Sequence, residues 1–357
     1  MTEPIIPRNG YDSQLGVDVG AQAADPDPWR RQVRNAVKQK DGKALEVLAA
    51  SSEIPRQPPA SLIVLASALR ALGLMEARID LLRQAQRQYP GDFWINLTLA
   101  GELAETEPPR SDEAVSYFRV ALALRPQSAV AYYNFANELT ADEAIHCYRT
   151  AIELNPKYVN AHCNLGIKLM DLGRIDEAVA SFRNAIEIDP KHTLATYYLG
   201  SSLRVQQKLP EAITYLHRAV ELAPKWSMAH HELGNALLDQ KQASEAITSF
   251  RKAIELRPTQ AHPYYALGNA LMDLGNLDEA IACYRKAIEI NPKLVPAHCN
   301  LGDELKSQGK LDEAIACYRT ASEIDPKYAK AHNGLGFALA TQGKLSEACP
   351  PRPGAGS

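Results

Sequence analysis

The sequence predicts an all-α protein, a solenoid in which antiparallel helix pairs stack one on the next. One observation is a proline that returns every 34 residues, at Pro190, Pro224, Pro258, Pro292 and Pro326. A second is the segment 161–191, whose sequence returns almost unchanged at 297–327, four periods later. A third is apolar spacing typical of one helix face, as at Leu62, Leu65, Ala66 and Leu69.

Composition and charge argue against several classes of protein. The 357 residues carry a net charge of −3, whereas a general nucleic-acid binder usually has a strong basic excess. No apolar run approaches the roughly 18 residues of a membrane-spanning helix. The N-terminus lacks the basic-then-apolar order of a signal peptide. We therefore expect a cytoplasmic protein with neither a nucleic-acid nor a membrane partner.

The six cysteines follow the repeat rather than a disulfide framework. Cys163 and Cys299 share one repeat position, and Cys147, Cys283 and Cys317 share another. No CxxC motif occurs. Duplication of one ancestral unit explains this spacing better than a disulfide framework or a zinc site. We expect reduced thiols, which suit the cytoplasm, and no cofactor.

Regular repeats occupy only part of the chain. Residues 1–26 lack periodicity and predict a disordered lead-in. A degenerate helix pair is expected over 27–58, irregular repeats over 59–158, and regular 34-residue repeats over 159–348, the last of them truncated. Residues 349–357, rich in proline and glycine, predict a disordered tail. Because no polar capping helix follows the last repeat, self-association through this end is a further expectation.

One repeat is shorter than the others. Pro126 and Pro156 are 30 residues apart, four fewer than the period. The missing residues belong to the turn between the two helices, so the first helix is expected to lose about one turn. The segment Thr140-Ala141-Asp142-Glu143 predicts a capping box that starts the second helix at once.

The five full units, 159–192 to 295–328, share one pattern. Glycines 173, 275 and 309 are expected to end first helices in a left-handed cap. A second set of glycines is expected where the two helices of a pair cross, each opposite a small alanine of the second helix. These pairs are Gly166/Ala178, Gly200/Ala212, Gly234/Ala246, Gly268/Ala280 and Gly302/Ala314. Large residues eight positions before each proline fill the stack: Phe182, Leu216, Phe250, Tyr284 and Tyr318.

This pattern resembles the tetratricopeptide repeat (TPR) family over residues 59–348, most closely from 159. The resemblance implies a right-handed superhelix of antiparallel helix pairs, whose first helices line a groove that binds a protein or peptide ligand. It places these side chains on the groove: Tyr133, Asn134, Asn137, Asn164, Ile167, Tyr197, Tyr198, Arg204, His231, Asn235, Tyr265, Asn269, Asn300, Asp303 and Lys306. A wider set adds Cys163, Ser201, Glu232, Met272, Cys299, Asn333 and Phe337. The alternative is a solvated face with no particular partner.

Two narrower resemblances suggest other functions. Residues 27–126 resemble the segment between kinase domain and repeats in planctomycete-type bacterial serine/threonine protein kinases, through Asp27-Pro28-Trp29-Arg30 and Tyr89-Pro90-Gly91-Asp92-Phe93-Trp94. This implies a regulatory arm without its kinase domain. The repeats also resemble the arm of protein O-linked N-acetylglucosamine transferases, whose asparagine ladder is matched by Asn134, Asn164 and Asn300. Other residues interrupt the ladder at Tyr198, Glu232, Ala266 and Gly334.

Candidate catalytic and metal-binding residues have structural explanations. His162, His230, His298 and His332 fall at one repeat position, so packing is favoured over metal ligation, which needs converging ligands. Acidic pairs such as Asp278-Glu279 recur at helix starts, where the helix dipole favours negative charge. No nucleophile stands beside an orienting base. We expect a protein-interaction scaffold and not an enzyme.

Overall fold

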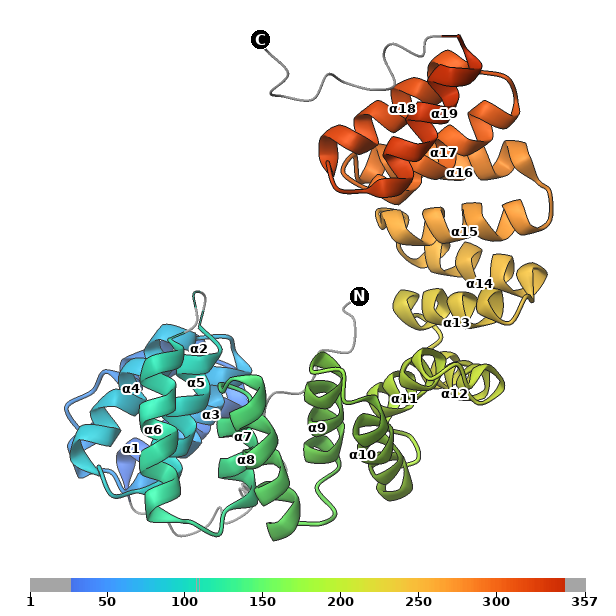
Figure 1. The fold of residues 1–357 in the computed structure, drawn as a ribbon. Helices are drawn as coiled ribbons and strands as arrows, with labels where there is room; N and C mark the ends of the chain where they lie inside the picture. The colour runs from blue at the N-terminus through green and yellow to red at the C-terminus, as the bar shows by residue number, and fades with distance from the viewer. Residues whose placement is uncertain (1–26, 107, 109, 344–357) are drawn as a thin grey trace, which may run out of the picture. The chain divides into compact units, whose positions relative to one another are not determined.

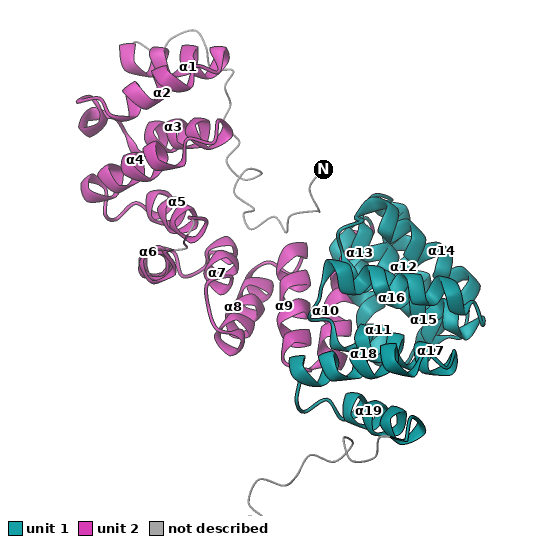
Figure 2. Ribbon diagram, turned by 90° about the horizontal axis from the view of Figure 1, so that it is seen from above, with its two compact units in different colours: residues 1–4, 191–357 teal, residues 5–190 magenta. Residues whose placement is uncertain are grey.

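A computed structural model describes residues 27–106, 108 and 110–343 of the chain. Within these residues all regular structure is helical, with 19 α-helices and one short 3-10 helix, which confirms the all-α prediction (Figure 1). The chain separates into a compact N-terminal unit, residues 5–190, and a C-terminal unit, residues 191–357 together with 1–4 (Figure 2). The predictions for 1–26 and 349–357 lie outside the described residues.

The N-terminal unit contains ten α-helices within its described residues, and consecutive helices pack as pairs. Their bounds are α1 Pro28–Gln39, α2 Gly42–Ala49, α3 Pro59–Ala71, α4 Met75–Gln88, α5 Phe93–Ala104, α6 Ser111–Leu124, α7 Ala129–Ala136, α8 Ala141–Leu154, α9 Val159–Asp171 and α10 Ile175–Ile188, with the 3-10 helix at Ile54–Arg56.

The C-terminal unit repeats one helix pair with little variation. Its helices are α11 Thr193–Val205, α12 Leu209–Leu222, α13 Ser227–Asp239, α14 Ala243–Leu256, α15 Ala261–Asp273, α16 Leu277–Ile290, α17 Val295–Ser307, α18 Leu311–Ile324 and α19 Ala329–Thr341. First helices of 13 residues alternate with second helices of 14 residues. Some first helices also contact the next first helix, as α11 contacts α13 and α13 contacts α15.

A large side chain of the second helix lies over the glycine where each pair crosses. A Cβ placed on Gly268 would lie 2.5 Å from Cε1 of Tyr284, and one on Gly234 would lie 2.5 Å from Cε1 of Phe250. The sequence pattern predicts that an alanine of the second helix lies closest to each glycine. The structure instead has the larger residue there. The alanines, such as Ala280, are fully buried, but the atoms nearest the glycine belong to the residue one turn further on.

The left-handed helix ends follow the prediction and extend it. Gly173, Gly275 and Gly309 have φ angles of 71°, 75° and 74°. Two repeats without glycine here adopt the same backbone, with φ 61° at Gln207 and 67° at Lys241. This conformation costs an L-residue roughly 1–2 kcal/mol. The packing of the helix pair therefore fixes the turn even where the local sequence disfavours it.

The repeated histidines tie four of the first helices, α9, α13, α17 and α19, to the turns before them. Nε2 of His162, His230, His298 and His332 lies 2.8–3.0 Å from the carbonyl oxygen of the proline six residues earlier. Because a carbonyl only accepts, the ring must donate through Nε2. Asn96 makes the same contact with Pro90, at 2.9 Å. These histidines therefore have the structural role expected of them.

The short repeat has lost part of its first helix. Helix α7 has eight residues, against 13 in α9, and α8 begins at Ala141 as predicted. The capping box is not formed, because Thr140 makes no side-chain cap. Its hydroxyl donates instead to Oε2 of Glu143 at 3.0 Å. A bond to a charged carboxylate is stronger than a neutral cap, which explains the exchange.

Replacing Lys241 by glycine should stabilise the protein by about 0.5 kcal/mol. Relief of the left-handed strain exceeds the entropy that glycine adds to the unfolded chain. Gly275→Ala is the matched variant, since its new Cβ would meet nothing within 4 Å and only backbone strain changes. It should lose about 1 kcal/mol in urea unfolding. A lower midpoint for Lys241→Gly, or an unchanged or higher midpoint for Gly275→Ala, would contradict this account of the turn.

Candidate functional site

Most of the fifteen predicted groove residues lie on first helices, but three of the fifteen are buried, as are Cys163, Glu232 and Cys299 of the wider set. Tyr133 and Asn134 on α7 are 0% and 2% exposed, and Tyr197 on α11 is 8% exposed. The tyrosine rings pack on neighbouring aromatic rings, Tyr133 on Tyr158 at 4.8 Å and Tyr197 on Trp226 at 4.6 Å between centroids. The expectation that these three side chains lie on an accessible surface is therefore wrong.

The other twelve predicted residues are half-buried. We call them the first-helix face, and describe it separately in each unit. In the N-terminal unit it comprises Asn137, Asn164 and Ile167. In the C-terminal unit it comprises Tyr198, Arg204, His231, Asn235, Tyr265, Asn269, Asn300, Asp303 and Lys306.

A hydrogen-bonded cluster joins three helices of the C-terminal unit. Tyr284 on α16 donates its hydroxyl to Oδ1 of Asn269 on α15, at 2.9 Å. Asn300 on α17 donates Nδ2 to the same oxygen at 2.8 Å, and to the hydroxyl of Tyr265 at 3.4 Å. Both donors use Oδ1 of Asn269, and its Nδ2 donates to no described residue.

The same cluster occurs in the N-terminal unit. Tyr148 on α8 donates to Oδ1 of Asn137 at 2.5 Å, and Nδ2 of Asn164 on α9 reaches that oxygen and the Tyr133 hydroxyl at 3.2 Å. Burial raises the pKa of Tyr133 to about 12, so its hydroxyl stays protonated. The two copies show that the network belongs to the repeat design.

The second-helix residue and the face residue opposite it vary together in all but one of these repeats. Where the second helix carries tyrosine, the face residue can accept its hydroxyl: Tyr148 with Asn137, Tyr284 with Asn269, Tyr318 with Asp303. Where it carries Phe182 or Leu216, the same position has Ile167 or Ser201. The exception is Phe250, opposite which Asn235 bonds to Glu232 and His231 instead. A buried hydroxyl needs a partner, which explains the pairing.

Charged residues replace this cluster between α11 and α13. Arg204 contacts Oε1 of Glu232 at 2.7 Å and Oδ2 of Asp239 at 2.9 Å. Asn235 donates Nδ2 to Oε2 of Glu232 at 3.2 Å and lies 3.3 Å from Nε2 of His231. Its own Oδ1 accepts from no described residue. Burial lowers the pKa of His231 to about 4, so this ring is neutral at physiological pH.

A third arrangement surrounds Asp303 on α17. Its carboxylate accepts from the Tyr318 hydroxyl at 2.6 Å and contacts Nζ of Lys330 at 3.0 Å. Burial alone would raise the pKa of Asp303, but these bonds and the charge of Lys306 outweigh it and lower the pKa. Nζ of Lys306 also lies 5.0 Å from the ring centroid of Phe337 on α19, which is 63% exposed.

Sequence reasoning missed Asp239 and Lys330, which complete these clusters. Both lie near the ends of their first helices, outside the positions that the family resemblance marks. A spacing of 27 to 35 residues between opposite charges, as in Asp303/Lys330 or Arg204/Asp239, would have been a usable signal.

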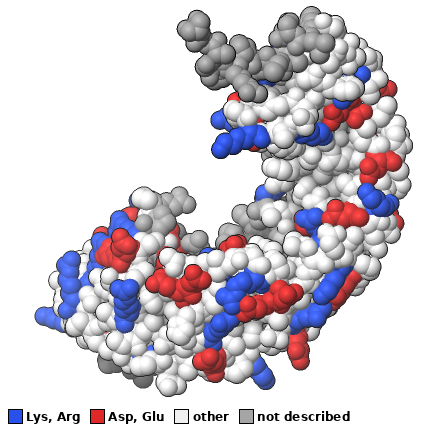
Figure 3. All heavy atoms as spheres, in the orientation of Figure 1, with Lys and Arg blue, Asp and Glu red and all other residues white. Residues whose placement is uncertain are grey.

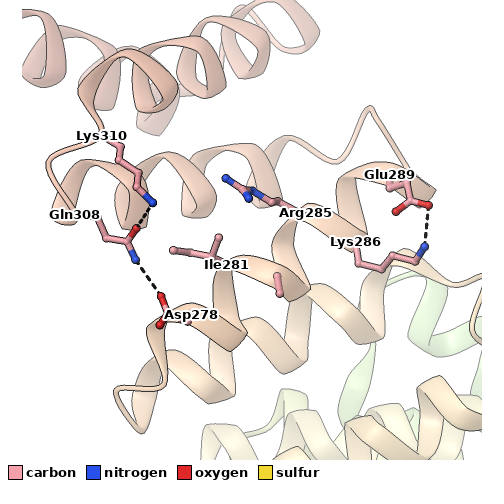
Figure 4. Close-up of a pocket in the computed structure, with 8 residues that line it drawn as sticks. Asp278, Ile281, Arg285, Lys286, Glu289, Gln308 and Lys310 are labelled. Carbon is pink, nitrogen blue, oxygen red and sulfur yellow. Dashed lines mark hydrogen bonds and ion pairs between the residues drawn. The ribbon is translucent and has the colours of Figure 1, made fainter.

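Other surface features offer less specific chemistry. A hollow of about 480 Å3 lies on the outer side of α16, but its charges pair locally: Lys286 with Glu289, and Gln308 with Asp278 and Lys310 (Figure 4). Figure 3 shows positive and negative side chains interspersed on the face it draws.

Among the described residues no group of three His, Cys, Asp or Glu could hold a metal ion. No described helix is long and apolar enough to cross a membrane.

Five of the cysteines lie in the described part, with free thiols; Cys349 lies outside it. Cys147, Cys163, Cys283 and Cys299 are buried. Burial raises the pKa of Cys163 to about 12. A neutral buried thiol acts as a small apolar side chain, which gives these residues a packing role.

Three family models match the sequence. One described as TPR repeat matches residues 141–167, 234–275, 268–303 and 302–343. One described as tetratricopeptide repeat matches 163–225, and one described as tetratrico peptide repeat matches 44–139. Together they span most of 44–343. Much of the segment 27–126 falls in the last match, and none of these matches relates it to protein kinases.

Several solved structures are similar to this chain. Cut9-Hcn1, the hetero-tetramer of APC/C, is 16% identical with a TM-score of 0.56, over 87% of this chain and 62% of that chain. YrrB, a TPR protein with an unusual peptide-binding site, is 23% identical with a TM-score of 0.44, over 52% and 96%. MamA is 29% identical with a TM-score of 0.43, over 46% and 97%. No curated protein matches the sequence.

Removing the Tyr284 hydroxyl should test the cluster on α15, α16 and α17. Tyr284→Phe leaves Oδ1 of Asn269 with one donor fewer and should lose about 1 kcal/mol of unfolding free energy. Adding Asn269→Ile recreates the Phe182/Ile167 pairing, so the double variant should lose about 1 kcal/mol less than the two single variants together.

Tyr264→Phe is the control for that cycle. Tyr264 is half-buried and makes no side-chain hydrogen bond with a described residue, so this change should lose less than about 0.5 kcal/mol. Additive effects of Tyr284→Phe and Asn269→Ile in urea unfolding would show that the two residues are not coupled.

Proposed function

Because the chain belongs to the tetratricopeptide repeat family, we propose that it is a scaffold without catalysis of its own. It binds an extended segment of a partner protein on the first-helix face of its C-terminal unit. The observation that carries this proposal is the pair Asn235 and Asn269, at one position of consecutive first helices. Oδ1 of Asn235 accepts from no described residue, and Nδ2 of Asn269 donates to none.

These two asparagines complement a peptide backbone. A free acceptor suits a backbone N–H, and a free donor pair suits a backbone C=O. Helices α13 and α15 are in contact, and packed helices lie about 8–10 Å apart. That separation equals about three residues of extended chain. One repeat can therefore engage each successive stretch of an extended ligand.

The hydrogen-bond networks hold these groups in place before a ligand arrives. Asn235 is fixed by Glu232 and His231, and Asn269 by Tyr284 and Asn300. Preorganised groups bind better because less side-chain entropy is lost on association.

Variation along the face supports selectivity for one partner. The buried leucines Leu199, Leu233, Leu267 and Leu301 keep the helix pairs alike. The position two residues after each leucine carries serine, asparagine or aspartate in these repeats: Ser201, Asn235, Asn269 and Asp303. Half-buried Tyr198 and Tyr265 add contact area at low entropic cost. A constant framework with a varied face suits recognition of one sequence over others.

Site-specific photo-crosslinking would test the proposal. A benzophenone amino acid is placed at Tyr198, Asn235 or Asn269 in the full chain, and at the outward-facing Glu255 or Glu289 as matched controls. Partners captured from the native cell extract should be the same at the three face positions and absent at the controls. Capture at Glu255 and Glu289 alone would contradict binding on the first-helix face.

A further inference from the structure

An aromatic pair at the start of α5 distinguishes this repeat from its neighbours. Phe93 and Trp94 are the first two residues of the helix, and their rings meet edge to face at 4.9 Å between centroids. The corresponding residues that open α7 and α9 are Ala129-Val130 and Val159-Asn160. Phe93 is buried, whereas Trp94 remains half-exposed. The helix-pair framework does not require an aromatic pair here.

Arg125, in the turn between α6 and α7, lies on both rings. Its guanidinium carbon is 4.5 Å from the centroid of Phe93 and 5.5 Å from that of Trp94. The side chain is exposed and forms no ion pair with any residue that the structure describes. Arg83 and Arg149 on neighbouring second helices, in contrast, each pair with a glutamate of the next repeat. Stacking on rings orients a guanidinium and leaves its N–H edge available to an anion.

These residues border a hollow of about 600 Å3 within the N-terminal unit. Trp94, Pro126 and Val130 supply apolar surface. Gln127, Ser128 and Asn155 supply polar groups, and Arg125 is the only charged residue that lines it. The N-terminus of α7 also faces this region, where the helix dipole adds positive potential. No residue of the hollow belongs to the first-helix face.

We propose that this hollow is a second binding site, which takes a protein segment carrying a carboxylate next to an aliphatic side chain. Arg125 pairs with the carboxylate through its free N–H edge. The aliphatic side chain lies on Trp94, Pro126 and Val130. A single cation matches one carboxylate, whereas a phosphate group is usually held by several cationic or N–H donors. The mainly apolar lining likewise favours a peptide over a nucleic acid.

Binding can be followed at Trp94 in the full chain. The chain has three tryptophans; Trp29 and Trp226 are buried and serve as internal references in a spectrum of the indole N–H groups. Trp94→Phe assigns the reporting signal. The probes are two capped pentapeptides, glycine-leucine-glutamate-leucine-glycine and its glutamine counterpart, together with a hexathymidine oligonucleotide.

The glutamate peptide should shift the Trp94 signal saturably and leave the other two signals in place. The glutamine peptide should bind about threefold weaker or more, since an exposed ion pair is lost. Arg125→Gln should remove the preference for glutamate. Arg119→Gln is the matched control: it removes the same charge from an exposed position of α6 outside the hollow, and should retain the preference.

Three results would overturn the proposal. The first is the absence of a saturable Trp94 shift at millimolar glutamate peptide. The second is equal binding of both peptides to the unmodified chain. The third is a shift caused by the oligonucleotide alone, which would assign the hollow to single-stranded nucleic acid. None of these results bears on the first-helix face, which the crosslinking experiment tests separately.

Discussion

The close crossing of two helices over a glycine is the constraint on which the rest of this structure depends. At Gly268 the absence of a side chain lets the ring of Tyr284 lie directly over the first helix. The hydroxyl of that ring then reaches Asn269 on the exposed side of the same helix. Packing inside the pair and the chemistry of its surface are therefore connected through one residue. Where Phe182 or Leu216 takes the place of the tyrosine, the surface residue changes with it.

Burial explains why this connection persists over a wide pH range. Burial raises the pKa of Tyr284, so its hydroxyl stays protonated and continues to donate. It lowers the pKa of His231 to about 4, so the charged cluster between α11 and α13 does not gain a proton near neutrality. These two side chains thus keep one protonation state under physiological conditions. A surface that binds by preorganised hydrogen bonds requires such constancy.

Periodicity predicted the fold, the left-handed glycine turns and the shortened α7, because all three depend on the spacing of residues along one chain. The family resemblance misplaced Tyr133, Asn134 and Tyr197, since it tells which side of a helix a residue lies on but not how far neighbouring side chains cover it. The left-handed backbone at Lys241 and the pairing of Asp303 with Lys330 also escaped prediction. Both are imposed by residues of other helices, and no local rule contains them.

Replacing Gly268 by alanine tests the central constraint most directly. The new methyl group would overlap the Tyr284 ring, which is 1% exposed and held by Asn269, so the variant should lose about 2 kcal/mol or more in urea unfolding. Gly336→Ala on α19 is the reference, because its Cβ meets nothing within 4 Å. It should gain about 0.5 kcal/mol from helix propensity. Equal stability changes for the two variants would contradict the account.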